Sequence, residues 1–138
     1  EDAVTVSSRP LHAIDCDLAD TPDLFPVVAV LAAHVDGVSR ISGIAHLVYK
    51  ESDRLQGMMD MLAAMGISLR LHPDGCTITG GRMHGARISA ADDHRLFMAA
   101  VIAGISADGV TEIADGDYAA SVSYPAFLRD IRELGGRI

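Results

Sequence analysis

Three short polar clusters contain the side chains best suited to chemistry. They are Asp20–Asp23, Lys50–Arg54 and Asp92–Arg95. Each cluster precedes an apolar segment with helical spacing, so each is predicted to lie between a strand and the first turn of a helix. The unpaired N–H groups and positive dipole end of a helix N-terminus bind anions readily. The positions of the clusters therefore point to an anion site built from helix starts.

Arg54 and Arg95 are the most informative residues of these clusters. A cation in the first turn of a helix meets the positive end of the dipole, which is unfavourable by roughly a few tenths of a kcal/mol. Each arginine is therefore expected to have an anionic neighbour. One interpretation is a local salt bridge, from Arg54 to Asp53 or Glu51, and from Arg95 to Asp92. The other is a shared carboxylate or phosphate ligand, because the guanidinium fork binds such groups bidentately.

Lys50 is the only lysine of the chain and stands next to Glu51. This lysine could be an ordinary surface charge, or the compact positive charge of a phosphate or hydroxyl site. Glu51 and Asp23 could simply compensate the dipoles of their helices. If their environments give them different pKa values, an Asp and a Glu at neighbouring strand-to-helix junctions could instead act as a pair, one donating a proton and the other abstracting one.

Two histidines lie near the clusters. His94 could donate a hydrogen bond to an anion or bind a metal, and His46 lies four residues before Lys50. No second histidine or cysteine stands at ligand spacing, so no metal site is predicted. The sequence also contains no Gly-rich phosphate loop, no nucleophile elbow and no Cys–His signature.

Composition limits the possible partners. A chain of 138 residues suits one domain with a real core. Its net charge of −8 argues against nucleic acid or an anionic membrane as partner. No apolar run approaches the roughly 20 residues of a membrane span, and no signal peptide is visible. Cys16 and Cys76 have no metal-type spacing. One disulfide between them is possible, but free, buried thiols of a cytosolic protein are the prediction.

An internal repeat organises the elements that must position the clusters. At an offset of 72 residues, DTPDLF (20–25) matches DDHRLF (92–97), and VDGVSRI (35–41) matches ADGVTEI (107–113). A repeat of this length is a supersecondary unit. We predict that the unit is used nearly twice, over about 11–80 and 86–138.

Each copy is predicted to begin with a short strand, at about 11–16 and 86–90, followed by a helix. Thr21 is expected to cap the first of these helices, and Gly-marked turns and β-branched strands follow at 38–41 and 110–113. The apolar positions at helical spacing in the first helix are Leu24, Val27, Val28, Leu31 and Val35.

The second half of each copy is predicted to contain a second helix. Ser52 is expected to cap one of these helices and Ser123 the other. The helix after Ser52 carries Leu55, Met58, Met59, Leu62 and Met65 on one face. A hairpin around 73–75 then completes the first copy, so the predicted unit is βαβαββ.

The motifs TPDLFP (21–26), KESDRL (50–55), DDHRLFMA (92–99) and SYPAF (123–127) occur in a familiar order. From about residue 15 to the C-terminus the sequence resembles the family of 5-enolpyruvylshikimate-3-phosphate (EPSP) synthases. The resemblance implies an α+β fold, an inside-out alpha-beta prism of βαβαββ repeats. Residues 1–138 would be a single partial domain with about two of the three repeats of the C-terminal half. The missing N-terminal half would be its partner.

The resemblance also implies a reaction. The family transfers the enolpyruvyl group of phosphoenolpyruvate to the 5-hydroxyl of shikimate 3-phosphate and releases phosphate. This step belongs to the cytoplasmic synthesis of chorismate and aromatic amino acids, and it needs no metal or organic cofactor. The isolated chain is expected to be inactive, because half of the shikimate site is missing.

The family pattern assigns roles to the clustered residues. Asp23 would be the base and Glu51 the acid. The implied ligands of shikimate 3-phosphate are Lys50, Asp23 and, as a further contact, His46. The implied ligands of phosphoenolpyruvate are Arg54, Arg95 and His94.

Two positions depart from the family pattern. Some members have an asparagine where His46 stands, and some have a phosphoenolpyruvate-binding lysine where Val122 stands. These departures leave the His46 contact and one phosphate contact uncertain. Two alternative functions also remain open. One is another enolpyruvyl transferase of the same fold, and the other is a non-catalytic domain that binds anions.

Overall fold

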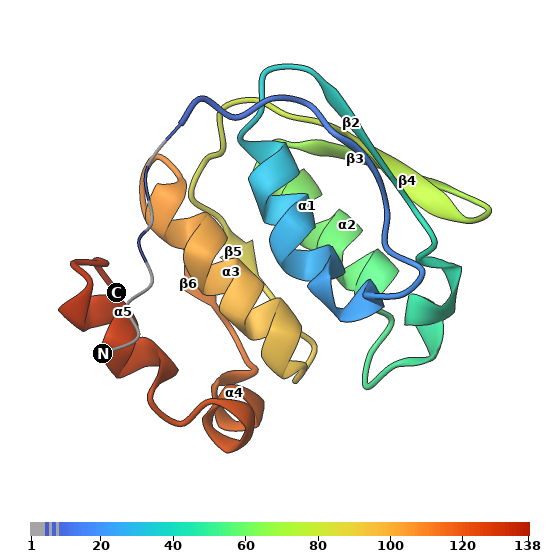
Figure 1. The fold of residues 1–138 in the computed structure, drawn as a ribbon. Coiled ribbons are helices and arrows are strands. Elements are labelled where there is room, and N and C mark those ends of the chain that lie inside the picture. Colours follow the sequence, from blue (N-terminus) through green and yellow to red (C-terminus); the bar gives the residue numbers. More distant parts are fainter. Residues whose placement is uncertain (1–4, 6, 8) are drawn as a thin grey trace.

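The first part of the chain forms a four-stranded sheet in the order β1-β2-β4-β3 (Figure 1). These strands are β1 (Asp15–Asp17), β2 (Val38–Ser42), β3 (Ser68–His72) and β4 (Gly75–Thr79). β1 is parallel to β2, and β4 is antiparallel to β2 and β3, which confirms the predicted hairpin. The computed structural model describes residues 5, 7 and 9–138.

One row of side chains across this sheet contains both cysteines. The strand register aligns Cys16 with Ile41 and Ile41 with Cys76. Aligned residues share a face of the sheet: Ile41 and Cys76 are buried in the core, whereas Cys16 is only partly buried and packs against it. Both cysteines are free thiols, as predicted. Burial raises the pKa of the Cys76 thiol to about 12.

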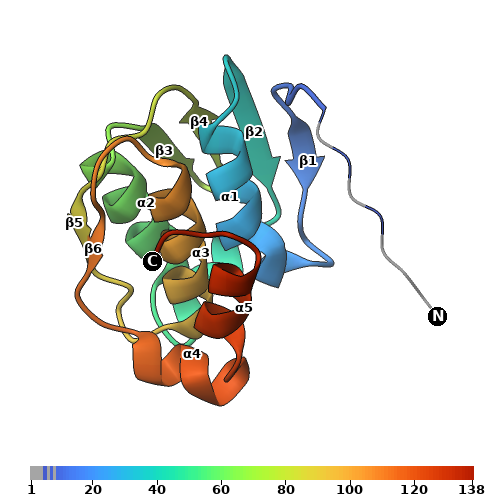
Figure 2. The same ribbon diagram turned by 90° about the vertical axis from the view of Figure 1, so that its left-hand side faces the viewer.

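Two helices cover the same face of the sheet (Figures 1 and 2). α1 (Phe25–Ala33) follows the 3-10 helix η1 (Pro22–Leu24), and α2 (Arg54–Ala64) follows the 3-10 helix η2 (Ala45–Tyr49). Thr21 stands at the cap position of η1, but its side chain makes no capping hydrogen bond. The chain thus enters α1 through a 3-10 turn rather than through the predicted threonine cap.

The buried face of α1 differs from the apolar positions chosen by spacing. Leu24, Val27 and Leu31 are each nearly half exposed, whereas Val28 is partly buried and Val35 is buried as predicted. The buried positions are Phe25, Pro26, Ala29, Val30, Ala32 and Ala33. Because α1 is apolar almost all round, spacing alone does not select a face. The alanines are small, and this lets α1 lie close to β4 and α3.

The second part of the chain forms a separate two-stranded sheet and three helices. In chain order these are β5 (Arg87–Ile88), α3 (His94–Ser106), β6 (Glu112–Ile113), α4 (Asp117–Ser123) and α5 (Phe127–Glu133). β5 is parallel to β6, as β1 is to β2. The turns after α1 and α3 contain Gly37 and Gly109, with φ of 137° and 97°, which favour glycine. The division into two repeat units remains a prediction.

The predicted role of Ser123 is wrong. Ser123 is the last residue of α4, and α5 begins after Ala126, whose side chain makes no capping bond. The residue before a proline is forced out of the helical region. Tyr124, which precedes Pro125, has φ −142° and ψ 81°, so the chain breaks between the two helices.

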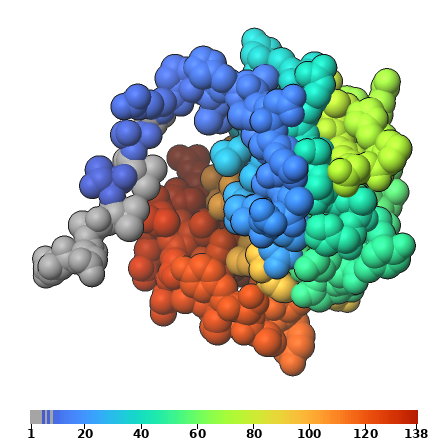
Figure 3. Space-filling model, turned by 45° about the vertical axis from the view of Figure 1, so that its right-hand side comes forward, coloured from blue at the N-terminus to red at the C-terminus, as the bar shows by residue number. Residues whose placement is uncertain are grey.

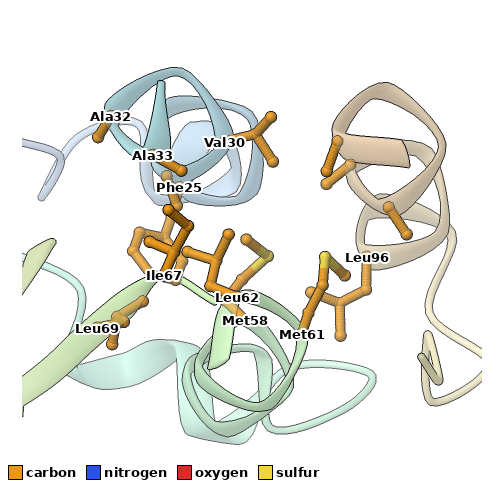
Figure 4. Close-up of a cluster of buried hydrophobic side chains, with 14 of the residues drawn as sticks. Phe25, Val30, Ala32, Ala33, Met58, Met61, Leu62, Ile67, Leu69 and Leu96 are labelled. Carbon is orange, nitrogen blue, oxygen red and sulfur yellow. The ribbon is translucent and has the colours of Figure 1, made fainter. Parts of the chain in front are cut away.

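The core lies where α1, α2 and α3 meet. Figure 4 shows Met58, Met61 and Leu62 of α2 pointing into the space between these helices, with Leu96 of α3 beside them. Leu62 is fully buried, and Met58 is too, whereas Met59 on the same helix is partly buried. The predicted apolar face of α2 is therefore confirmed for Leu55, Met58, Leu62 and Met65, and Met59 lies at its edge.

We expect Leu62→Ala to lower the free energy of unfolding by about 2–5 kcal/mol, because it leaves a cavity among three helices. Urea denaturation of the chain measures this loss. Met59→Ala, on the partly buried side of α2, serves as the matched control and is expected to cost less. Equal losses for the two variants would contradict the packing described above.

Candidate active site

The three polar clusters meet at one end of the helices. In Figure 3 the segments near residues 23 (blue), 50 (green) and 95 (gold) adjoin on one face of the molecule. At their centre lies Arg54, whose side chain is only 1% exposed. Its Nε donates to Asp93 Oδ2 at 2.8 Å, Nη1 to Asp23 Oδ1 at 2.8 Å, and Nη2 to Glu51 Oε2 at 2.6 Å. One guanidinium thus binds three carboxylates from three segments.

Asp23 forms ion pairs with three cations. Besides Arg54, its carboxylate contacts Arg95 Nη2 at 3.1 Å and Lys50 Nζ at 3.4 Å. Arg95 Nη1 also donates to the Asp23 backbone oxygen at 3.3 Å. Burial acts to raise the pKa of Asp23, but Arg95, Lys50 and Arg54 together outweigh it and lower that pKa. Asp23 is therefore ionised at neutral pH and remains 41% exposed, open to a ligand.

Asp93 is the residue that sequence reasoning missed. Its side chain is fully buried, and its Oδ1 accepts from the backbone N–H groups of Arg95 and Leu96 at 2.8 and 3.3 Å. Burial acts to raise the pKa of Asp93, but the hydrogen bonds from Arg54 and the two N–H groups lower it overall. An Asp just before a helical segment is an N-cap signal that could have been noted. Nothing in the sequence shows that Arg54 shares this cap.

The start of α2 is one residue later than predicted. Asp53, not Ser52, is the N-cap, and its side chain accepts from the Gln56 N–H at 3.0 Å. Ser52 Oγ instead donates to Asp93 Oδ2 at 3.1 Å. Aspartate caps as well as serine does, so the hydroxyl is left to bind the buried carboxylate.

The local salt bridges are present only in part. Arg54 pairs with Glu51 but not with Asp53, whose carboxylate is used by the cap. Arg95 pairs with Asp23, 72 residues away, rather than with Asp92. Asp92 is exposed and has φ of 52°, so the chain turns sharply before the helix that carries Arg95. The arginines thus bind acids of other segments, which local spacing cannot show.

The two histidines are placed differently from the arginines. His94 is the first residue of α3 and is half-buried, and His46 is exposed in η2. Within the described part of the chain, no hydrogen bond or ion pair joins either histidine to the Arg54 cluster. Val122, at the position of the family lysine, is 70% exposed on α4.

The arrangement can bind an anion next to two acids. Lys50, Arg54 and Arg95 surround one carboxylate, and an incoming carboxylate or phosphate would compete for the same donors. A shallow cavity of about 220 Å³ adjoins Asp23 and Arg95. The larger hollow, about 920 Å³ between α3, β6 and α5, is lined by both apolar and charged side chains, none of them from the cluster. Over the residues described, no three His, Cys, Asp or Glu side chains are grouped as in a metal site.

Comparison with known proteins identifies the family of this chain. Residues 1–131 match the family of EPSP synthase (3-phosphoshikimate 1-carboxyvinyltransferase). The chain belongs to the EPSP synthase family. It is 44% identical over 135 residues to the 3-phosphoshikimate 1-carboxyvinyltransferase of Methanocella arvoryzae, covering 98% of this chain and 32% of that protein. For the enzyme of the same name from Methanosarcina mazei the identity is 46% over 136 residues, covering 98% and 31%.

Solved structures agree with this assignment. An EPSP synthase from Acinetobacter baumannii superposes with a TM-score of 0.84 at 33% identity, covering 91% of this chain and 31% of that one. The enolpyruvyl transferase NikO from Streptomyces tendae gives 0.74 at 18% identity over 95% of this chain and 30% of that one, a likeness of fold alone. The predicted α+β fold of the EPSP synthase type is thereby confirmed. The chain spans about a third of the length of the curated relatives it matches.

No helix in the described part of the chain combines the length and the apolar character that crossing a bilayer requires.

Proposed function

We propose that this chain contributes the acids and the anion-binding cations of an EPSP synthase. The reaction would transfer the enolpyruvyl group of phosphoenolpyruvate to the 5-hydroxyl of shikimate 3-phosphate and release phosphate. Residues of a further N-terminal half would complete the shikimate site, and the enzyme would act in the cytoplasm. The observation that carries the proposal is the convergence of Lys50, Arg54 and Arg95 on Asp23, with Glu51 bound to the same arginine.

The chemistry needs a proton acceptor at the hydroxyl and a proton donor at the methylene carbon of phosphoenolpyruvate. Asp23 and Glu51 lie on opposite ends of one guanidinium, bound to Nη1 and Nη2 of Arg54. In our proposal Asp23 accepts the hydroxyl proton as the new C–O bond forms, and Glu51 protonates the methylene carbon. Glu51, now a carboxylate, then takes a proton back from the methyl group of the tetrahedral adduct as the C–O bond to phosphate breaks. This restores the carbon–carbon double bond and gives the enol ether product.

The cations would prepare Asp23 for this role. As long as Arg95, Lys50 and Arg54 bind its carboxylate, the pKa of Asp23 is low and Asp23 is a weak base. An anionic substrate that takes over the two guanidinium groups would remove this lowering. Binding of phosphoenolpyruvate by Arg54, Arg95 and the adjacent His94 would therefore release a stronger base.

The remaining contacts in the proposal concern the second substrate. Lys50, whose side chain is about one-third exposed, would bind the phosphate of shikimate 3-phosphate. His46, exposed four residues before it, would be a further contact with that substrate. Electrostatic preorganisation and positioning by these side chains would provide the rate enhancement.

The test is phosphate release from phosphoenolpyruvate plus shikimate 3-phosphate. We expect a longer protein that contains this chain to turn over both substrates, and the 138-residue chain alone to release no phosphate. Turnover with a different acceptor hydroxyl would identify another enolpyruvyl transferase. Binding without turnover by the longer protein would identify a non-catalytic domain. Phosphate release by the isolated chain would contradict the proposed need for the other half.

A further inference from the structure

Asp93 uses both of its carboxylate oxygens, and each serves a different element. Oδ2 accepts from Arg54 Nε at 2.8 Å and from Ser52 Oγ at 3.1 Å, at the start of α2. Oδ1 accepts from the N–H groups of Arg95 and Leu96 at 2.8 and 3.3 Å, in the first turn of α3. The side chain is fully buried, so no water replaces these donors.

We propose that Asp93 is a positioning residue of the anion site, and that its one buried carboxylate fixes both Arg54 and the helix turn that carries Arg95. Asp93 itself is too deeply buried to contact substrate. The inference rests on the proposed function for its link to catalysis, but its structural content can be measured separately.

The direction of the hydrogen bonds supports this role. Asp93 takes the Nε–H of Arg54, the inner edge of the guanidinium, and this leaves Nη1 and Nη2 to face the exposed carboxylates of Asp23 and Glu51. Those two nitrogens are the ones an incoming anion would use. A guanidinium held at Nε has a fixed plane, and this preorganisation lowers the cost of ordering it when the anion binds.

The chain before Asp93 is held in an unfavourable conformation. Ala91 and Asp92 have φ of 51° and 52°, in the left-handed region that non-glycine residues rarely adopt. Asp115 stabilises this turn, since its carboxylate accepts from Ser89 Oγ at 2.6 Å and from the Ala90 N–H. Strained backbone of this kind persists where surrounding contacts fix it, often beside functional sites. Here it sets the direction in which Asp93 enters the core.

Asparagine cannot take the place of Asp93. Its amide has one acceptor oxygen and one NH₂ donor, whereas the site presents four donors divided between two oxygens. In either orientation the NH₂ group would face a set of donors. It would face the Nε–H of Arg54 in one orientation, and the N–H groups of the first turn of α3 in the other, and none of these groups can accept a hydrogen bond.

The first measurement is the Arg54 Nε–H signal in ¹H–¹⁵N spectra of the chain, assigned by its loss in Arg54→Lys. A buried, hydrogen-bonded Nε–H is expected to exchange slowly with water. In Asp93→Asn this signal should shift and exchange at least tenfold faster. Asp53→Asn is the matched control, because Asp53 also caps a helix but contacts neither arginine. It should leave the Arg54 signal unchanged.

The second measurement is binding of inorganic phosphate to the same chain. Asp93→Asn should weaken it by roughly tenfold to a hundredfold, the equivalent of one charge-assisted hydrogen bond. A merely structural role would leave the contribution of Arg95 intact. We instead expect Arg95→Gln to cost severalfold less affinity in the Asp93→Asn background than in the unaltered chain.

Several outcomes would overturn the inference. These are an unchanged Arg54 signal in Asp93→Asn, phosphate affinities equal to those of Asp53→Asn, or an unaltered chain that binds no phosphate. If Asp93→Asn does not fold, Ser52→Ala takes its place, and it should shift the Arg54 signal and weaken phosphate binding severalfold. No effect of Ser52→Ala would then count against the role of Asp93. Failure of the longer protein to transfer enolpyruvyl groups would defeat the proposed function and leave these two measurements unaffected.

Discussion

Asp23→Asn and Glu51→Gln are each expected to lower kcat of a longer protein containing this chain by roughly 10²- to 10⁴-fold, the usual contribution of one general acid or base. Both substitutions keep the shape of the side chain and remove its ability to exchange a proton. Steady-state kinetics with phosphoenolpyruvate and shikimate 3-phosphate measures the loss. Exposed Asp20, in the same cluster as Asp23, offers Asp20→Asn as a control that should retain kcat.

Unlike kcat, the affinity for anions should not fall in Asp23→Asn. Lys50, Arg54 and Arg95 all bind the Asp23 carboxylate. Because this carboxylate competes with a ligand, its neutralisation should leave phosphoenolpyruvate binding equal or tighter while turnover collapses. A variant that loses affinity and kcat together would show that Asp23 acts on ligand binding rather than on the chemical step.

Local sequence patterns predicted several elements of the fold correctly. The hairpin at 68–79 was predictable because Pro73-Asp74-Gly75 stands between two β-rich runs. The polar clusters occupy equivalent positions at helix starts, and this indicated that they form one anion site. The face of α1 was not predictable, because every residue of α1 is apolar and no polar side chain marks the side that faces solvent. Only the neighbouring β4 and α3 decide which of its apolar residues are buried.

The site itself was predictable in its residue types but not in its pairings. The cation in the first turn of α2 did indicate an anionic partner, and three were found for Arg54. Two of these, Asp23 and Asp93, are 31 and 39 residues away in sequence. Such pairs depend on how helices pack, so a local motif shows which charges need partners without showing which partners they take.

Arg54→Met is expected to be the most damaging substitution for stability, with a loss of about 3–5 kcal/mol in the free energy of unfolding at neutral pH. Methionine fills much of the same volume, so the loss comes chiefly from the buried Asp93 carboxylate left without its cation. Urea denaturation measures it. Arg87→Met is the matched control, because Arg87 is 75% exposed and its pair with Glu112 spans 3.6 Å. Exposed pairs contribute at most about 1 kcal/mol.

The loss in the free energy of unfolding that Arg54→Met causes should become smaller at low pH. The pKa of Asp93 in the folded chain is lowered, so the carboxylate stabilises the native state above its unfolded value of about 4 and loses this contribution as pH falls through the lower folded pKa. In Arg54→Met the hydrogen bond from Arg54 is gone and burial acts to raise that pKa. Asp93 then protonates more readily in the folded variant. The difference in stability between the two proteins should therefore shrink as the pH falls from the folded pKa of Asp93 in the variant to its lower folded pKa in the unaltered chain.

A double substitution separates this account from simple loss of packing. Arg54→Met with Asp93→Asn removes both the cation and the buried negative charge. The asparagine has only one acceptor oxygen for Ser52 Oγ and the N–H groups at the start of α3, so one of these donors loses its partner. Removal of both partners of a buried pair costs less than removal of one. The double variant should therefore be more stable at neutral pH than Arg54→Met alone, and its stability should vary less with pH. If the losses in the free energy of unfolding from the two substitutions instead add, Arg54 stabilises the fold by filling space. The buried charge pair is then not the source of the loss.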